Sequence, residues 1–159
     1  MEKGIIQVYY GEGRGKTSAA LGNAIRFASD GKSVYLVQFM KGQLSSEFLN
    51  RLEPEMKIFR FERGAESFDD MSEEQRKEER QNIQNGLMFA KKALVTGECD
   101  VLVLDEVLGL VEEGMATEDQ LVDILKAKSM VTDVILTGRN AVPAVFEIAD
   151  NVLNIVPEK

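Results

Sequence analysis

The chain has 159 residues, of which 44% are hydrophobic and 29% are charged, and its formal net charge is −8. These values predict a single globular domain over residues 1–159, and they exclude nucleic acid as the main partner, since that function requires a basic face. No apolar run is long enough to span a membrane and no signal-peptide pattern is present, so we expect a cytoplasmic protein without membrane contact. The sequence has one cysteine, Cys99, and no histidine, which excludes an internal disulfide and catalysis by imidazole.

The first predicted elements are a strand over Ile5–Tyr9, a glycine-rich loop and a helix over Thr17–Phe27. The loop and the start of the helix read Gly11-Glu12-Gly13-Arg14-Gly15-Lys16-Thr17-Ser18. Glycines let successive backbone N–H groups turn inward, and a helix N-terminus attracts anions, so this order of elements predicts a phosphate cradle. Lys16 can reach terminal phosphates, and the Thr17 hydroxyl can hold a divalent metal ion that bridges two of them.

This loop departs from the common phosphate-loop pattern G-x-x-x-x-G-K-[ST]. That pattern would place its first glycine at position 10, where the chain has Tyr10, while Gly11 and Gly13 lie inside the loop instead. The alternative interpretation is a glycine-rich turn that precedes a helix by chance. Lys16 and Thr17 at the start of the helix favour phosphate binding.

The next segment is predicted to contain two strands, Ser33–Phe39 and Lys57–Phe61, with a short helix over Ser46–Leu52 between them. Lys41 follows the first of these strands. Ligands bind at the carboxyl ends of strands in open α/β sheets, so Lys41 is either a phosphate contact or a solvated loop lysine.

A loop over Glu62–Met71 carries Phe68, which either covers a flat ligand or packs into the body of the protein. The capping box Ser72–Gln75 then opens a long helix that ends near Gly97. Its first half is nearly all charged and is interpreted as a solvated face. Its second half has the apolar spacing of a helix packed on a sheet. The residues on that apolar face are Ile83, Leu87, Ala90 and Leu94.

Two adjacent acids lie at the end of the apolar strand predicted over Asp100–Asp105. Asp105 is the last residue of this strand, and Glu106 follows it. In phosphate-loop proteins an acid at this position holds the metal ion directly or through water. The alternative is a strand that has simply reached solvent. Because a buried carboxylate needs a cation or hydrogen-bond donors to offset its lost hydration, we favour the metal site.

The last third of the chain adds another capping box at Thr117–Gln120 and a strand over Thr132–Thr137. Arg139 follows this strand at the expected ligand edge, where it either clamps phosphate oxygens or lies on the surface. A short helix around Pro143–Ile148 and a final strand over Val152–Val156 complete the predicted elements.

Four motifs along the chain resemble those of the ATP:corrinoid adenosyltransferases of the cobalamin pathway. They are GEGRGKTSAA at 11–20, VQFMKG at 37–42, LDE at 104–106 and LTGR at 136–139. The resemblance implies an α/β fold with a parallel RecA-like P-loop sheet and helices on both faces, usually as a homodimer. It also implies transfer of the 5′-deoxyadenosyl group of ATP to Co(I) of a reduced corrinoid, either cob(I)alamin or cob(I)yrinic acid a,c-diamide, with release of triphosphate.

The resemblance further implies roles for individual residues. Those expected to bind the substrates are Gly11, Glu12, Gly13, Arg14, Gly15, Lys16, Thr17, Ser18, Arg26, Lys41 and Phe68. Lys16 is expected to act in catalysis together with Arg139. A Mg²⁺ or Mn²⁺ ion is expected on Thr17 and Glu106, with Asp105 as an alternative ligand.

Two other functions fit the same residues. A P-loop ATPase or kinase would use Asp105 and Glu106 for the metal ion and for activating water. A non-catalytic module would bind a corrinoid or nucleotide without turnover. The adenosyltransferase interpretation adds a flavoprotein reductase as an expected partner.

Overall fold

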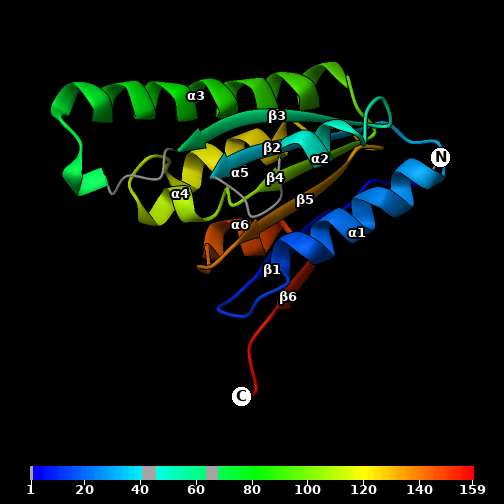
Figure 1. Cartoon of the computed structure of the whole chain (residues 1–159). Coiled ribbons are helices and arrows are strands. Elements are labelled where there is room, and N and C mark those ends of the chain that lie inside the picture. The colour runs from blue at the N-terminus through cyan, green and yellow to red at the C-terminus, as the bar shows by residue number, and fades with distance from the viewer. Residues whose placement is uncertain (1, 41–45, 64–67) are drawn as a thin grey trace.

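Six parallel strands form one sheet in the computed structural model, which describes residues 2–40, 46–63 and 68–159, with the backbone alone at positions 46, 62, 63 and 68. The strands are β1 (Ile6–Tyr10), β2 (Val34–Met40), β3 (Met56–Arg63), β4 (Val101–Asp105), β5 (Asp133–Gly138) and β6 (Asn151–Asn154). Their order across the sheet is β3-β2-β4-β5-β1-β6 (Figure 1). The predicted parallel α/β fold is confirmed.

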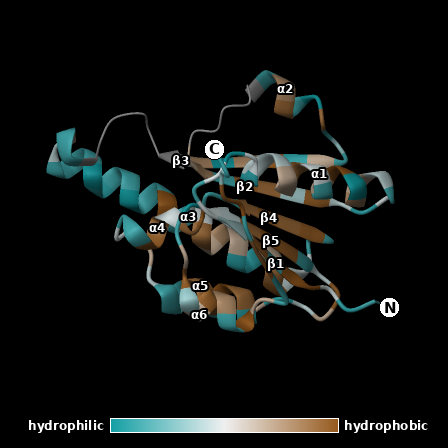
Figure 2. Cartoon of the chain, turned by 90° about the horizontal axis from the view of Figure 1, so that it is seen from below, coloured by the Kyte–Doolittle hydropathy of each residue, from teal (hydrophilic) through white to brown (hydrophobic). Residues whose placement is uncertain are grey.

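Helices cover both faces of this sheet (Figure 2). They are α1 (Lys16–Ser29), α2 (Ser46–Asn50), α3 (Glu73–Thr96), α4 (Gly109–Glu112), α5 (Glu118–Lys126) and α6 (Pro143–Ile148), with a 3-10 helix η1 (Phe68–Asp70) before α3. Helices α1 and α2 pack on one face, and α3, α5 and α6 pack on the other. Within the part of the chain that the structure describes, no helix is both long and apolar enough to cross a membrane.

Burial on both faces explains why the strands read as continuous apolar runs and not as alternating ones. In β4, Leu102 and Leu104 point into the core shared with α3 and α5, whereas Val101 and Val103 point into the core shared with α1. All four side chains are buried. The sheet is therefore the middle layer of three.

The two predicted capping boxes turn out differently. The N–H of Gln75 donates to Ser72 Oγ at 3.2 Å, and the N–H of Ser72 donates to Gln75 Oε1 at 2.9 Å, so the first box is confirmed. At the second, Thr117 Oγ1 accepts from the N–H of Gln120 at 3.1 Å. The side chain of Gln120 instead pairs with that of Gln84 on α3, with an Nε2–Oε1 distance of 2.7 Å. A tertiary contact has replaced the local one.

Most element bounds agree with the sequence-based predictions within one or two residues, and three differences matter. Strand β3 continues to Arg63, two residues into the predicted loop. Helix α4 was not expected. The final strand stops at Asn154, and Ile155 turns toward the loop that follows β1.

All strands run in the same direction, so their carboxyl ends share one edge of the sheet. Strand β5 pairs with β1 on one side and with β4 on the other. The segments that follow these three strands therefore meet at that edge. Helix α3 extends well beyond the edge with its hydrophilic first half (Figures 1 and 2).

Candidate functional site

The loop between β1 and α1 is shaped for an anion. Gly15 adopts a left-handed backbone with φ of 104° immediately before α1. The first N–H groups of a helix have no partner within the helix and carry its positive end, so they are available to phosphate oxygens. Lys16 Nζ donates to the carbonyl oxygen of Gly13 at 3.0 Å, which folds this side chain back over the loop.

Two glycines of the loop serve a different purpose from the one expected. The N–H of Gly11 donates to Gly138 O at 3.2 Å, and the N–H of Gly13 donates to Ile155 O at 2.7 Å. The N–H of Ile155 in turn donates to Tyr10 O at 2.7 Å. A Cβ at Gly13 would lie 2.7 Å from Ile155 O. These two N–H groups attach the loop to the rest of the protein, which corrects the expectation that they turn inward. The place of Gly11 and Gly13 in the substrate-binding loop stays a prediction.

A hydrogen bond joins the loop to the acidic end of β4. Thr17 Oγ1 donates to Asp105 Oδ1 at 2.9 Å, and Thr137 Oγ1 donates to the same oxygen at 2.8 Å. The residue Asp105 is 1% exposed, and its other oxygen, Oδ2, is buried with no hydrogen-bond partner among the residues that the structure describes. Burial raises the pKa of Asp105, while the hydroxyls of Thr137 and Thr17 and the charge of Lys16 act against the rise.

Glu106 lies next to this buried acid in an unusual conformation. Its φ of 61° is left-handed, a region that side chains other than glycine seldom adopt. Its N–H donates to Thr137 Oγ1 at 2.8 Å. Burial and then the charge of Asp105 raise the pKa of Glu106, whereas the charges of Lys16 and Arg139 oppose that rise.

Arg139 reaches the loop through an ion pair. Its Nη2 lies 3.1 Å from Oε2 of Glu12, and both side chains are well exposed. An exposed pair of this kind adds little to stability. It does hold a guanidinium beside the phosphate cradle, where incoming phosphate oxygens would compete with Glu12 for it.

The structure brings the side chains of six predicted residues together at one edge of the sheet. They are Glu12, Lys16, Thr17, Asp105, Glu106 and Arg139. The side chains of Arg14 and Ser18 are exposed at the loop and at the first turn of α1.

Three other predicted residues are not brought to this group. Arg26 lies in the last turn of α1, about 15 Å along the helix axis from Lys16. The role of Arg26 in binding the substrates stays a prediction. Lys41 lies outside the described residues. Phe68 begins η1, but its side chain also lies outside what the structure describes.

Two residues of the site were not singled out from the sequence. Thr137 had a recognisable signal, since it is a polar residue at the end of the apolar strand β5, next to a glycine. Ile155 had none, because it contributes only its backbone N–H and carbonyl groups. No side-chain pattern reports a contact made by the main chain.

The donor set fits a small divalent cation such as Mg²⁺. Such ions prefer oxygen ligands and keep several waters and phosphate oxygens around them. The unpartnered Oδ2 of Asp105 and the Thr17 hydroxyl supply oxygens of this kind next to the cradle. Across residues 2–40, 46–63 and 68–159, no group of three or more acidic or thiol side chains could hold a metal ion by itself. A cation here would therefore depend on the nucleotide as well.

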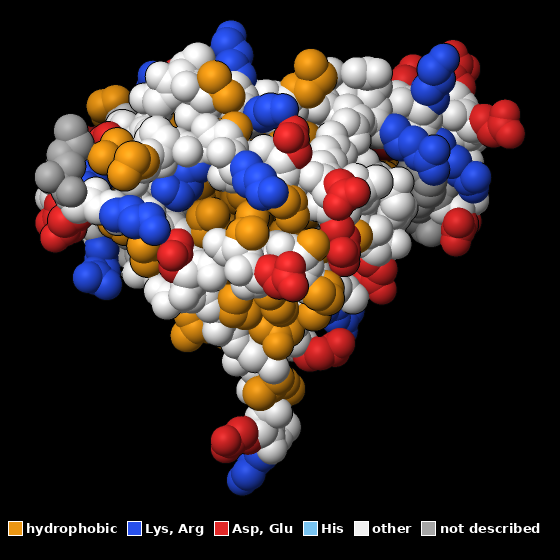
Figure 3. Space-filling model, turned by 180° about the vertical axis from the view of Figure 1, so that it is seen from behind, with side chains coloured by type: hydrophobic (Ala, Val, Ile, Leu, Met, Phe, Trp, Pro, Cys, Tyr) orange, Lys and Arg blue, Asp and Glu red, His pale blue; other side chains and the backbone are white. Residues whose placement is uncertain are grey.

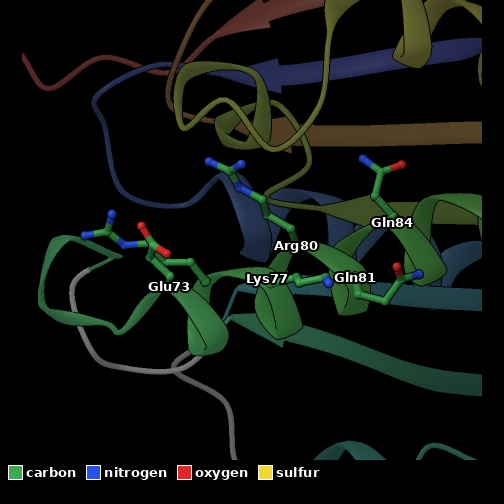
Figure 4. A pocket seen from close by; sticks show the side chains of 6 residues that line it. Glu73, Lys77, Arg80, Gln81 and Gln84 are labelled. Carbon is green, nitrogen blue, oxygen red and sulfur yellow. The ribbon is translucent and has the colours of Figure 1, made fainter.

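A concave surface lies on the projecting half of α3, apart from the residues described above. Its lining residues are Glu73, Arg76, Lys77, Arg80, Gln81 and Gln84, around a cavity of about 410 Å³. Gln84 Nε2 donates to Met115 O at 2.8 Å, which ties this wall to the segment before α5. Figure 4 shows Arg80 and Gln84 pointing to the same side of the helix. The half of α3 that carries these residues extends beyond the carboxyl edge of the sheet (Figure 1), and Arg76 Nη2 donates to Asp69 O of η1 at 3.0 Å.

Residues 2–159 match a family model described as "ATP:corrinoid adenosyltransferase BtuR/CobO/CobP". The chain is 32% identical over 158 residues to the corrinoid adenosyltransferase of Escherichia coli strain K12, covering 99% of this chain and 79% of that protein. The same identity and coverage are found for the corrinoid adenosyltransferase CobA of Salmonella typhimurium.

Solved structures with the same fold are more distant in sequence. The KaiC-like protein PH0186 of Pyrococcus horikoshii superposes with a TM-score of 0.63 at 17% identity, covering 100% of this chain and 76% of that one. The flagellar accessory protein FlaH of Methanocaldococcus jannaschii gives a TM-score of 0.64 at 14% identity, covering 97% and 72%. These likenesses establish the RecA-like P-loop fold alone.

Proposed function

The chain belongs to the ATP:corrinoid adenosyltransferase family, and on this premise we propose how its residues carry out ATP-dependent adenosyl transfer to a corrinoid. The triphosphate of ATP binds the loop over residues 11–18, next to Asp105 and Glu106. The observation that carries this assignment is the hydrogen bond from Thr17 to Asp105, which joins the phosphate loop to the acidic strand end. Oδ2 of Asp105, which has no hydrogen-bond partner among the described residues, belongs to the same carboxylate.

The transfer itself needs positioning more than proton chemistry. Co(I) of the reduced corrinoid attacks the 5′-carbon of ATP, the bond between that carbon and the phosphate oxygen breaks, and triphosphate leaves with the electron pair. Co(I) is a strong nucleophile, so no general base is required, which agrees with a chain that has no histidine. Lys16 and Arg139 stabilise the charge left on triphosphate, and the loop holds the 5′-carbon in line with cobalt.

We propose Mg²⁺ as the metal ion, held by Thr17 and Glu106, with Asp105 as an alternative ligand. When bound, the ion neutralises negative charge on the triphosphate. Glu106→Gln keeps the size of the side chain and removes its charge, and Thr17→Val removes the hydroxyl. Both variants should need more Mg²⁺ for half-maximal activity. Unchanged Mg²⁺ titrations in both would remove these residues from the metal site.

The corrinoid is proposed to lie beside the first half of α3, next to η1. The cavity lined by Lys77 and Arg80 supports this side, because Arg76 in the same lining donates to Asp69 O of η1 at 3.0 Å. If Phe68 excludes water from cobalt, Phe68→Ala should impair conversion when cobalt must be reduced on the protein. The loss should be much smaller when Co(I) is supplied, and ATP affinity should stay unchanged. Equal losses in both assays would place the corrin contact elsewhere.

We infer that the reducing equivalents come from outside the chain. The only cysteine, Cys99, is buried, so the chain cannot form a dithiol couple of its own. We propose a flavoprotein reductase as the electron donor and the cytoplasm as the shared compartment. Mixing the protein with a reduced flavoprotein, ATP and Co(II) corrinoid should give product, and a reaction without the flavoprotein is the control.

The protein is also proposed to form a homodimer through the edge of the sheet. Strand β6 is an edge strand whose Val152 and Leu153 are exposed, and Val156 beyond it is exposed as well. Figure 3 shows hydrophobic side chains gathered above the protruding C-terminal end. Edge strands with exposed apolar residues readily pair with another chain. Sedimentation should give a dimer for the parent and a monomer for Leu153→Glu, and a monomeric parent would contradict the proposal.

One assay separates the proposed function from its alternatives. The protein is incubated with ATP, Mg²⁺ and chemically reduced cobalamin while the loss of the Co(I) absorption spectrum is followed. An adenosyltransferase releases triphosphate only when the reduced corrinoid is present. Phosphate released from ATP alone would indicate an ATPase, and tight corrinoid binding without an adenosylated product would indicate a binding module.

A further inference from the structure

Thr137 connects the two acids of the site through a single hydroxyl group. It lies in β5 with 0% of its surface exposed, among apolar neighbours such as Ile135 and Leu136. Its Oγ1 lies 2.8 Å from Asp105 Oδ1 and 2.8 Å from the backbone nitrogen of Glu106.

The direction of both hydrogen bonds follows from the groups involved. The backbone N–H of Glu106 can only donate, so the oxygen of Thr137 accepts there. The hydroxyl has one proton, and an ionised carboxylate can only accept, so that proton goes to Asp105. The hydroxyl of Thr137 is therefore used in both directions, and neither acid can shift without breaking a bond to it.

We propose that Thr137 is a positioning residue for the metal site, an inference that rests on the Mg²⁺ proposed above. Together with Thr17, it draws Oδ1 of Asp105 into two hydrogen bonds and leaves Oδ2 as the oxygen available to the metal and its waters. The same hydroxyl accepts from the backbone N–H of Glu106. It thereby holds the left-handed backbone that sets the direction of the Glu106 side chain.

A role of Thr137 in packing alone can be distinguished from a role of its hydroxyl by substitution with valine. Valine has nearly the shape of threonine and would fill the same space between the strands. If Thr137 served packing alone, Thr137→Val would fold normally and bind Mg²⁺ and nucleotide like the parent. If the hydroxyl orients the acids, the valine variant loses metal affinity although its packing is kept.

The test measures binding of a non-hydrolysable ATP analogue by calorimetry, with Mg²⁺ and with EDTA, and without corrinoid. For Thr137→Val we expect the Mg²⁺-dependent gain in affinity to fall on the order of tenfold, as for loss of a charge-assisted hydrogen bond, while binding in EDTA stays unchanged. Thr137→Ser, which keeps the hydroxyl, should recover most of the gain.

Thr132→Val is the matched control. Thr132 is also buried, but it precedes β5 at the opposite end of the strand, where its Oγ1 bonds to Ser129 Oγ at 2.7 Å. It should keep the full Mg²⁺ effect. If Thr137→Val does not fold, the pair Thr137→Ser and Thr137→Ala isolates the hydroxyl, because both lack the methyl group.

The outcomes distinguish the role proposed for Thr137 from the proposed Mg²⁺ site on which that role rests. A parent protein whose nucleotide affinity ignores Mg²⁺ would overturn both. A parent that responds to Mg²⁺ together with a Thr137→Val variant that responds equally would overturn the role of Thr137 alone. So would an equal loss in Thr132→Val, or a loss of binding in EDTA of the same size as with Mg²⁺.

Discussion

Single side chains carry most of the electrostatic work at this site. Lys16 is half-buried and already bonded to a loop carbonyl, so its charge is held above the cradle before any nucleotide arrives. Asp105 and Glu106 lie beyond it with raised pKa values, and the charge of Lys16 opposes both rises. Removing this one charge would therefore leave the repulsion between the triphosphate and the two carboxylates uncompensated.

Lys16→Ala should lower adenosyl transfer at saturating ATP about a hundredfold, since a charge-assisted contact to phosphate contributes a few kcal/mol. The measurement is the rate at which the Co(I) spectrum disappears. Lys92→Ala, at an exposed position of α3, is the control and should keep the parental rate. A Lys16→Ala variant with nearly full turnover would mean that triphosphate does not lie on this loop.

Cys99 gives a pH-dependent prediction away from the site. Burial, and then the charges of Asp100 and Glu98, raise the pKa of its thiol from 9.0 to about 12. At pH 8.5 the folded protein should therefore react with iodoacetamide at least tenfold more slowly than the protein in urea. Because the folded-state pKa is above the unfolded value, the thiol's contribution to stability is lost as pH rises from 9 toward 12. Equal alkylation rates would show an accessible thiol.

At the scale of elements, helix α3 packs closely on the sheet because a glycine, Gly86, faces it. Gly86 is buried in the middle of α3, where a Cβ would lie 2.7 Å from the ring of Phe61 and 2.9 Å from that of Phe39. Gly22, in α1, has no atom within 4 Å of the same position. The two glycines share a helical backbone and differ in their surroundings.

Opposite effects on stability are expected from alanine at these positions. Gly86→Ala should lower the free energy of unfolding by about 1 to 3 kcal/mol, because overpacking outweighs the better helix propensity. Gly22→Ala should raise it by about 1 kcal/mol, because only the propensity changes. Urea unfolding of both variants tests this. A stabilising Gly86→Ala would show that α3 can move away from β3 at little cost.

The sequence predicted those parts of the fold that depend on local pattern. Apolar runs gave the strands, the Ser72 capping box gave the start of α3, and the loop with Asp105 gave the centre of the site. Contacts between distant segments were not predictable. The side chain of Gln120 pairs with Gln84 on α3 and not with the N-terminus of its own helix, and the N–H of Gly13 donates to the carbonyl of Ile155. Neither contact is reported by a local motif.

For the molecule as a whole, we expect the buried acid of the site to lower stability. Asp105 is 1% exposed and its Oδ2 has no hydrogen-bond partner among the described residues, so its charge costs free energy unless a cation offsets it. Without metal, Asp105→Asn should raise the free energy of unfolding by about 1 to 3 kcal/mol, because the buried charge is gone while the two hydroxyls still find an oxygen.

The same variant should lose Mg²⁺-dependent nucleotide binding. Asp123→Asn is the control, since Asp123 lies exposed on α5 in an ion pair with Lys91 at 2.6 Å. Its stability should change by less than about 0.5 kcal/mol. Thermal unfolding in EDTA reports the first effect and calorimetry the second. A less stable Asp105→Asn would mean that the buried charge is better compensated than its contacts indicate.

The two hydrogen bonds that attach the phosphate loop also determine at which stage of folding the site forms. The loop over residues 11–18 is synthesised well before its anchors, Gly138 and Ile155, because both lie more than 100 residues later in the chain. Parallel strands that pair across a long separation come together late in folding. A nascent chain would thus carry the whole loop sequence without a formed cradle. Nucleotide becomes a ligand of this protein only once β5 and the segment after β6 have docked beside β1.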